Sequence, residues 1–300
     1  MLPFLFTILL ALMIEWVFGW ARLLAPWAAI PLGGLALAIT LMLASYMLRA
    51  WRVADHFSIR GHFGAVLSLN LQHNLWNNLL PMRAGELSFP LLMRQKFGAD
   101  PAYALAGLFW IRLVDAQVLA ALALGSLLWL ARVETLAVLL LALALIAPFA
   151  FWMMRGWLAA RVANMREGKL RALFDKALAG LPRDARHFAV GVALTWANWL
   201  VKLAALAWVL RQFVAIDWAG AGLGVLGGEL TSVLPIHAPG GFGTYEAGML
   251  AALLPQGLPL GGATAAAINT HLFLLGSSLL FGLLAMLIPG KSATMRVDKN

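Results

Sequence analysis

The chain has 300 residues, of which 62% are hydrophobic and 12% are charged, with 0 cysteines and a formal net charge of +9. A soluble globular protein carries about 25% charged residues, so the composition excludes a soluble domain and indicates an integral membrane protein. Disulfides, thiolate catalysis and cysteine-based metal sites are excluded as well. We therefore predict an all-α fold, a polytopic membrane helical bundle.

Six apolar stretches are long enough to cross a bilayer, whose core needs about 20 residues of helix. The first has neither the basic start nor the small-residue cleavage site of a signal peptide, so we expect it to be retained. The predicted crossings are Pro3–Leu24, Trp27–Leu48, Ala102–Leu130, Val133–Met154, Phe188–Leu210 and Gly262–Ile288.

Two further stretches, 62–98 and 219–258, are apolar but interrupted. The first contains Pro81 and Gly85, and the second contains two prolines and three glycines between residues 234 and 243. Proline removes a helical hydrogen bond and glycine weakens a helix, so neither stretch can continue as one helix. We predict that each is a broken, re-entrant helical hairpin.

Basic residues gather in the segment 155–187 and in the C-terminal tail. Because these charges flank apolar spans, the positive-inside rule explains them better than nucleic-acid binding does. We expect 155–187 to be a cytoplasmic basic loop and both chain termini to be cytoplasmic. Within this loop, the stretch Lys169–Leu181 is amphipathic and suited to lie on anionic lipid.

This topology gives the two halves the same order of elements in opposite orientation. Each half reads as helix, helix, broken hairpin, long helix, with the halves at about 1–131 and 132–290 of a single transmembrane domain, 1–300. Matched, Gly/Pro-interrupted segments in inverted halves indicate the central site of a transporter. A chance match of two proline-containing breaks is the alternative.

Polar side chains crowd the first break, where apolar residues would be expected at membrane depth. Asn77 and Asn78 precede it, and Arg83 and Glu86 lie within it, three residues apart. A local ion pair near the surface would contribute little. Polar groups in lipid are costly and usually face an interior, which favours a substrate-binding role.

The second break combines a glycine-rich turn with the start of a helix. Backbone N–H groups in such a turn, together with the positive end of the helix, favour an anion such as a phosphate headgroup. Glu246 could also compensate the helix dipole in the first helical turn, and this role is compatible with anion binding. His237 is more readily explained as an interfacial residue. The candidates here are His237, Gly240, Gly241, Gly243, Thr244 and Glu246.

Charged residues also occur inside the predicted crossings, where they are functional by default. Arg112 and Asp115 lie three apart in one long helix, so they also suit a structural pair. Lys202 lies towards the middle of its helix, and Glu15, Glu229 and His271 are further buried candidates, of which Glu15 is the weakest.

Three motifs together resemble the lysylphosphatidylglycerol synthase transmembrane (flippase-like) family. They are Asn77–Glu86 (NNLLPMRAGE), Arg112–Asp115 (RLVD) and Pro239–Glu246 (PGGFGTYE). Their order and spacing agree with the family over most of the chain. Residues Leu87–Pro90 depart from it, because a basic residue is more often found there, which leaves the headgroup open.

The resemblance implies a bacterial inner-membrane protein that moves a lipid, or a lipid-linked phosphate-bearing molecule, between leaflets. We expect no aminoacyl-transferase activity, since the chain has no room for a synthase domain, and no cofactor. The partners would be the bilayer and a lipid with an anionic or polyprenyl-linked headgroup, with a homo-oligomer left open. Arg83, Arg112 and Lys202 would meet the phosphate, while Glu86, Asp115 and Glu246 would switch partners or protonate.

Other functions remain open at this point. A Walker A motif is absent, so an ion gradient or the lipid gradient would drive transport. A secondary transporter of a small solute would have a similar central site. A membrane lipid-phosphate enzyme is disfavoured, because the zinc-protease and nucleophile-elbow motifs are absent. An accessory protein without transport activity is the last alternative.

Overall fold

The computed structural model describes residues 12, 15–17, 19–131, 135–232 and 239–287. These ranges contain α-helices, short 3-10 helices and no strand. Their contacts divide the chain into two compact units. Unit 1 comprises Met1–Ser45, Asn74–Glu86 and Leu200–Leu284, and unit 2 comprises Tyr46–His73, Leu87–Trp199 and Ala285–Asn300.

Five stretches of the described chain are long and apolar enough to cross a membrane. Together with the absence of strands from the described ranges, they confirm the predicted all-α membrane bundle. The spans are Leu32–His56, Pro101–Ser126, Val138–Ala163, Ala185–Phe213 and Leu260–Met286. They correspond to α3 (Leu32–His56), α6 (Pro101–Ala131), α7 (Thr135–Met153) with α8 (Arg155–Ala163), α10 (Ala185–Phe213) and α13 (Leu260–Met286).

The second predicted crossing was placed too early in the chain. The stretch Ala25–Ala29 is a 3-10 helix, η1, and α3 begins at Leu32 directly after Pro31. At its other end α3 continues past Leu48 to His56. Arg52 near its C-terminal end joins the helix because it finds a buried partner, Asp115 on α6, a property that hydropathy alone does not detect.

Much of the first predicted crossing, residues 3–11, 13, 14 and 18, lies outside the described chain. Where the chain is described, Gly19 separates helical residues 15–17 from α2 (Trp20–Leu24). The φ angle of Gly19 is +73°, a left-handed value that an α-helix does not allow. One continuous helix as far as Leu24 was therefore wrong at this glycine.

Both interrupted stretches contain the predicted break. The first consists of α4 (Phe63–Leu79), the 3-10 helix η3 (Pro81–Leu87) and α5 (Ser88–Phe97). The second consists of α11 (Trp218–Ser232), the 3-10 turn η4 (Pro239–Gly241) and α12 (Thr244–Leu253). The longest of these α-helices, α4, has 17 residues, or about 25 Å at 1.5 Å per residue. Re-entry into the membrane and the inverted repeat stay predictions.

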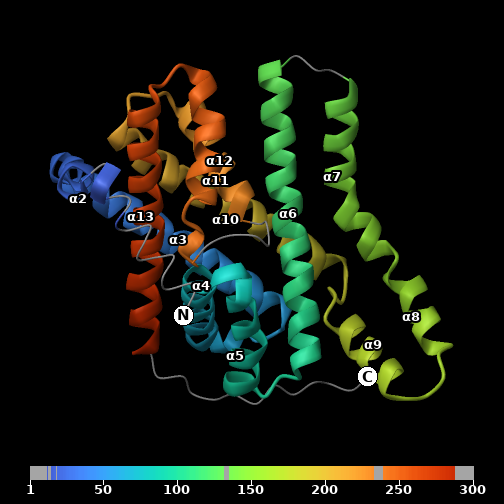
Figure 1. Cartoon of the computed structure of the whole chain (residues 1–300). Coiled ribbons are helices and arrows are strands. Elements are labelled where there is room, and N and C mark those ends of the chain that lie inside the picture. The colour runs from blue at the N-terminus through green and yellow to red at the C-terminus, as the bar shows by residue number, and fades with distance from the viewer. Residues whose placement is uncertain (1–11, 13–14, 18, 132–134, 233–238, 288–300) are drawn as a thin grey trace. The chain divides into compact units, whose positions relative to one another are not determined.

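In unit 2, α7 runs beside α6 (Figure 1). The predicted basic loop 155–187 is itself largely helical, because it contains α8 and α9 (Lys169–Ala179). An apolar core joins α3, α4, α5 and α6, and includes Phe57, Leu69, Phe89 and Phe97, each at most 2% exposed. This core fixes the helices that carry the charged side chains of the unit.

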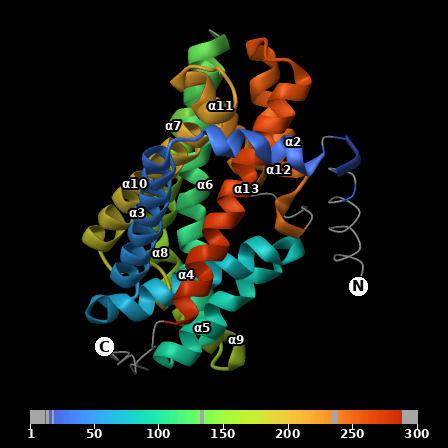
Figure 2. The same cartoon turned by 90° about the vertical axis from the view of Figure 1, so that its left-hand side faces the viewer.

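In unit 1, the helices α11 and α12 approach each other through glycines. A Cβ atom on Gly227 would lie 2.2 Å from the carbonyl oxygen of Gly248, so a larger residue would force the helices apart. The helix α2 crosses α13 (Figure 2), where Asn269 Nδ2 donates to the Leu23 carbonyl at 2.9 Å. Asn269 Oδ1 accepts from Trp27 Nε1 at 2.7 Å, which also attaches η1 to α13.

Candidate functional site

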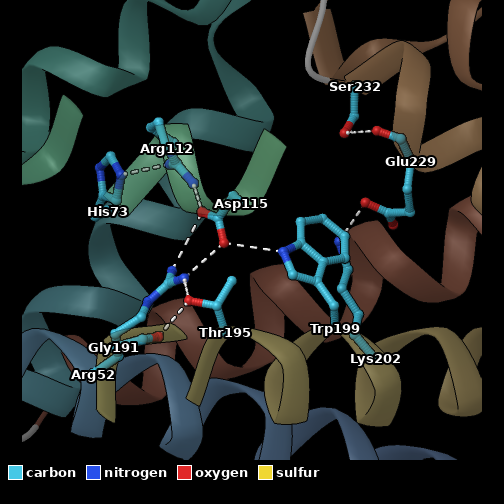
Figure 3. Close-up of polar contacts among 10 residues, drawn as sticks. All are labelled: Arg52, His73, Arg112, Asp115, Gly191, Thr195, Trp199, Lys202, Glu229 and Ser232. Atoms are coloured by element: carbon cyan, nitrogen blue, oxygen red, sulfur yellow. Dashed lines mark hydrogen bonds and ion pairs between the residues drawn. The ribbon is translucent and has the colours of Figure 1, made fainter. Parts of the chain in front are cut away.

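A buried ion pair connects two of the candidate spans in unit 2. Arg52 on α3 is 3% exposed and Asp115 on α6 is 5% exposed. Arg52 Nη1 lies 2.7 Å from Asp115 Oδ1, and Arg52 Nη2 lies 3.3 Å from Oδ2 (Figure 3). This two-pronged geometry suits the planar guanidinium and holds both side chains in one orientation.

Asp115 accepts two further hydrogen bonds from the same unit. Arg112 Nη1 donates to Asp115 Oδ2 at 3.3 Å, which confirms the pair predicted from their spacing. Trp199 Nε1 on α10 donates to Asp115 Oδ1 at 3.0 Å. Arg52 also donates to Thr195 Oγ1 at 2.7 Å. One carboxylate is therefore shared by two guanidinium groups and an indole. We call Arg52, Arg112, Asp115, Thr195 and Trp199 the arginine cluster.

A histidine extends the arginine cluster towards the first break. Arg112 Nη2 lies 3.2 Å from His73 Nε2, and His73 Nδ1 lies 2.9 Å from Ser88 Oγ. A guanidinium can only donate, so Nε2 must accept and the proton of His73 must be on Nδ1. His73 is therefore neutral in this arrangement, and its Nδ1–H donates to Ser88.

In unit 1, Lys202 and Glu229 form a second buried pair. Lys202 Nζ on α10 lies 2.7 Å from Glu229 Oε2 on α11 (Figure 3). The Glu229 residue is 1% exposed. Its other oxygen, Oε1, accepts from Tyr245 Oη on α12 at 3.2 Å. The sequence had singled out both charged residues, and the structure brings them together with a tyrosine.

The second break is closed by the chain's own glutamate. Glu246 Oε2 accepts from the backbone N–H of Gly243 at 2.7 Å, and Oε1 lies 2.6 Å from His271 Nδ1 on α13. Gly240, Gly241 and Gly243 all have positive φ, between +71° and +86°, which only glycine adopts easily. The anion at the start of α12 is thus a carboxylate of the protein, as dipole compensation predicts, and a phosphate would have to displace it.

Aromatic rings and a hydroxyl hold this second break in place. The Tyr245 ring stacks on His271 at 4.3 Å between centroids, and Phe242 lies against the same imidazole at 4.8 Å. Thr244 Oγ1 donates to the Gly241 carbonyl at 3.1 Å. Glu229, Lys202, Tyr245, Glu246 and His271 are called the glycine-break cluster below.

In the first break, the predicted asparagines contact different elements. Asn78 Nδ2 donates to Ser278 Oγ on α13 at 2.9 Å. Asn77 meets η3 directly, since a Cβ on Gly85 would lie 2.3 Å from the Asn77 Cα. Glycine is therefore required where η3 passes over α4. Glu86 follows Gly85 and is half-buried.

Two predicted site residues cannot be placed. His237 lies outside the described residues, and so does the side chain of Arg83. The predicted pairing of Arg83 with Glu86 therefore stays a prediction.

Sequence reasoning missed several contributors to both clusters. From the sequence, Arg52 is expected on the cytoplasmic side, because it follows the predicted crossing Trp27–Leu48. Its burial depends on Asp115, which is 63 positions away in the sequence. His271 was predicted as a buried candidate, whereas Tyr245 gave only the signal of a polar residue beside a glycine-rich turn. Among the described residues, no group of His, Asp and Glu side chains is arranged to hold a metal ion.

The three motifs thus lie in a helical membrane bundle, with Arg112 and Asp115 paired and Glu246 closing the second break. The protein-family model of the lysylphosphatidylglycerol synthase TM region matches residues 2–282 of the sequence. The chain belongs to this family. Members contain a membrane domain associated with lipid or flippase-like function. No curated protein and no solved structure matches this family member.

Proposed function

We propose that this family member is a flippase-like transporter that moves a lipid or a lipid-linked, phosphate-bearing molecule between membrane leaflets. The proposal places it in the bacterial inner membrane, with the basic segment 155–187 and both termini on the cytoplasmic side. It acts as a transporter rather than as an enzyme.

The sharing of one buried carboxylate by two arginines supports the proposal most strongly. Asp115 binds Arg52 and Arg112 between apolar helices, where a charged group is costly unless it is paired and hydrogen-bonded. Within the described chain, Nε of Arg52 is buried and makes no hydrogen bond. A phosphate accepts from guanidinium groups in the same geometry as a carboxylate does. A headgroup could therefore replace Asp115 as the partner of one arginine.

The glycine-break cluster supports a role in driving or gating transport. Glu229 has Lys202 as its counter-ion, whereas the partner of Glu246 is a histidine, which is charged only when protonated. One proton thus decides whether Glu246 and His271 form a neutral ion pair or carry a net negative charge. The same carboxylate holds the Gly243 N–H. Protonation in this cluster would therefore be linked to the conformation of the break.

Leaflet exchange in proteoliposomes tests this function. The purified protein is reconstituted with a fluorescent anionic phospholipid, a zwitterionic phospholipid or a polyprenyl phosphate, and loss of outer-leaflet label to an impermeant quencher is followed. We expect exchange of a phosphate-bearing lipid to be faster than in empty liposomes. Arg112→Ala and Glu246→Ala should abolish the gain, and the exposed Arg161→Ala should retain it.

Each remaining outcome has a distinct meaning. If Arg112→Ala and Glu246→Ala leave the exchange intact, the result supports lipid transport. It also rejects both clusters as the transport site. No exchange of any tested lipid by the folded wild-type protein would contradict the proposal and favour a small-solute transporter or an accessory role.

A further inference from the structure

The amphipathic helix α9 is fixed at the ends of two candidate spans in unit 2, α3 and α6. The C-cap residue of α9, Gly180, accepts from His56 Nε2 at 2.9 Å, and His56 is the last residue of α3. Lys176 Nζ lies 2.7 Å from Asp100 Oδ2, directly before α6 begins. The Pro182 carbonyl, which follows α9, accepts from Arg155 Nη1 at 2.9 Å, and Arg155 begins α8 within the candidate span Val138–Ala163.

These contacts place α9 beside the C-terminal end of α3 and the N-terminal end of α6. The ends of membrane-spanning helices lie at the boundary between hydrocarbon and headgroups. Gly180 packs tightly there, because a Cβ on it would lie 2.6 Å from the Cβ of Ala106 in the first turns of α6. The helix α9 is therefore held at the depth of the lipid headgroups.

One face of α9 is apolar and uncovered. Leu170, Leu173 and Phe174 are 59%, 51% and 43% exposed, respectively. These positions follow the i, i+3, i+4 spacing of a single helix face. Exposed leucine and phenylalanine are expected on the spans, which face lipid, but α9 is not one of the candidate spans. Facing lipid as part of a membrane span therefore does not explain why the apolar face of α9 is exposed.

Basic side chains flank this apolar face. At 3.6 residues per turn, Lys169 and Arg171 project to opposite sides of Leu170. On the neighbouring α8, the guanidinium of Arg161 lies 5.0 Å from the ring of Trp157, which is 54% exposed. The segment 161–176 carries five basic and two acidic residues, a net charge of +3. An apolar face bordered by cations matches the chemistry of an anionic lipid surface.

We propose that α9 docks on the anionic headgroups of the protein's own membrane leaflet. Leu170, Leu173 and Phe174 enter the acyl boundary, while Lys169 and Arg171 contact lipid phosphates. The docking site is separate from both charged clusters and does not depend on the proposed transport. It gives the predicted basic loop a defined partner, a membrane surface rich in anionic lipid.

The test uses single cysteines, since the natural chain has 0. Leu173→Cys reports the apolar face, and Ala172→Cys, which is also exposed, reports the opposite face as a matched control. Each protein carries an environment-sensitive fluorophore and is placed in nanodiscs of phosphatidylcholine with or without phosphatidylglycerol. Quenching by acrylamide measures access from water, and quenching by spin-labelled lipid measures access from the membrane.

We expect the label at 173 to be quenched by spin-labelled lipid and the label at 172 by acrylamide, with the contrast largest when phosphatidylglycerol is present. Lys169→Gln with Arg171→Gln should lower the docking equilibrium by roughly fivefold per removed charge. Higher salt should act in the same direction. Elution as a monodisperse peak would show that these surface variants remain folded.

Three results would overturn the proposal. Equal acrylamide quenching at 172 and 173 in both lipids would show that the helix does not meet the membrane. A label at 173 protected from both quenchers would mean that protein covers this face. Lipid quenching at 173 that is indifferent to phosphatidylglycerol and to both substitutions would reject the anionic lipid as the partner.

Discussion

The arginine cluster and the glycine-break cluster are both buried and charged, but they are built in different ways. The first joins side chains of the long helices α3, α6 and α10, and its permanent charges are two guanidiniums on one carboxylate. The second centres on an interrupted helix whose backbone is itself a hydrogen-bond partner, and one of its two carboxylates pairs with a histidine.

The two clusters therefore suit different tasks. The arginines suit binding of an anion, and the histidine suits a response to protonation. Arginine stays charged at any physiological pH, so the two guanidiniums of the arginine cluster keep their positive charge whatever the proton concentration. The glycine-break cluster contains a histidine, the type of side chain that is charged only when protonated. The proposed transport would use both properties, and the residues that would supply them belong to different segments of the chain.

The largest effect should follow from removing the shared carboxylate. Asp115→Ala leaves the buried Arg52 and the half-buried Arg112 without their common anion, and loss of a buried ion's partner costs about 3–5 kcal/mol. We expect a large drop in the thermal unfolding midpoint in detergent. Gln117→Leu, on the same helix and also buried, serves as the control and should change it little. Equal losses in both variants would remove the distinction between the cluster and its surroundings.

The next largest effect should come from Glu246→Gln. The amide keeps the shape of the side chain but removes the charge that binds both Gly243 N–H and His271. Hydrogen bonds to charged groups contribute about 1.5–3 kcal/mol, so a smaller drop than for Asp115→Ala is expected. Thr244→Ala, which removes a neutral hydrogen bond in the same turn, should cost less. If Thr244→Ala is the more harmful change, the carboxylate does not hold the break.

Lys202 and Glu229 should show energetic coupling. In a double-mutant cycle with Lys202→Met and Glu229→Gln, the double variant should be more stable than the sum of the single losses predicts, by about 0.5–3 kcal/mol. Tyr245→Phe with Lys202→Met provides a comparison, because these two residues contact different oxygens of Glu229. If the losses of unfolding free energy in the two single variants simply add in the double variant, Lys202 and Glu229 do not stabilise each other.

The smallest effect concerns Asp100 and Lys176, a pair outside both clusters. The hydrogen bond from Lys176, together with the N–H groups of Ala102 and Tyr103, holds the pKa of Asp100 below its ordinary 3.8 against a smaller effect of burial. The resulting stability is complete above pH 3.8 and is lost as the pH falls through the lower folded-state pKa. Exposed pairs contribute about 0.2–1 kcal/mol.

Lys176→Gln should therefore lower the unfolding midpoint slightly at neutral pH and make no difference below the pKa of Asp100 in the folded protein. Unfolding followed by tryptophan fluorescence from pH 7 downward measures this. A loss as large as that of Asp115→Ala would show that surface pairs and buried pairs are not distinguished in this fold.

Sequence patterns predicted the helices well and their partners poorly. Hydropathy located the spans, and proline and glycine located both breaks, because these depend on local properties of the chain. The spacing of Arg112 and Asp115 predicted their contact for the same reason. The sharing of Asp115 with Arg52 and Trp199 depends on packing between distant segments, which no single-sequence pattern contains.

Arg52 illustrates the limit most clearly. A charged residue after an apolar stretch ordinarily marks the membrane boundary, and this rule placed Arg52 on the cytoplasmic side, beyond the end of the span. The helix α3 instead continues to His56, since Asp115 and Thr195 satisfy the guanidinium inside the bundle. The carboxylate of Glu246 was predicted better, because its role at the start of α12 follows from its position in the first helical turn.

If the arginine cluster is the anion site, the folded protein should bind a lipid with a phosphate headgroup in preference to its neutral counterpart. The thermal unfolding midpoint is measured with a polyprenyl phosphate and with the matching neutral polyprenol, for the wild type, Arg112→Gln and the exposed control Arg161→Gln. We predict that only the phosphate-bearing lipid stabilises the wild type and Arg161→Gln, and that Arg112→Gln loses this preference. An undiminished preference in folded Arg112→Gln would contradict the assignment of the arginine cluster as the anion site.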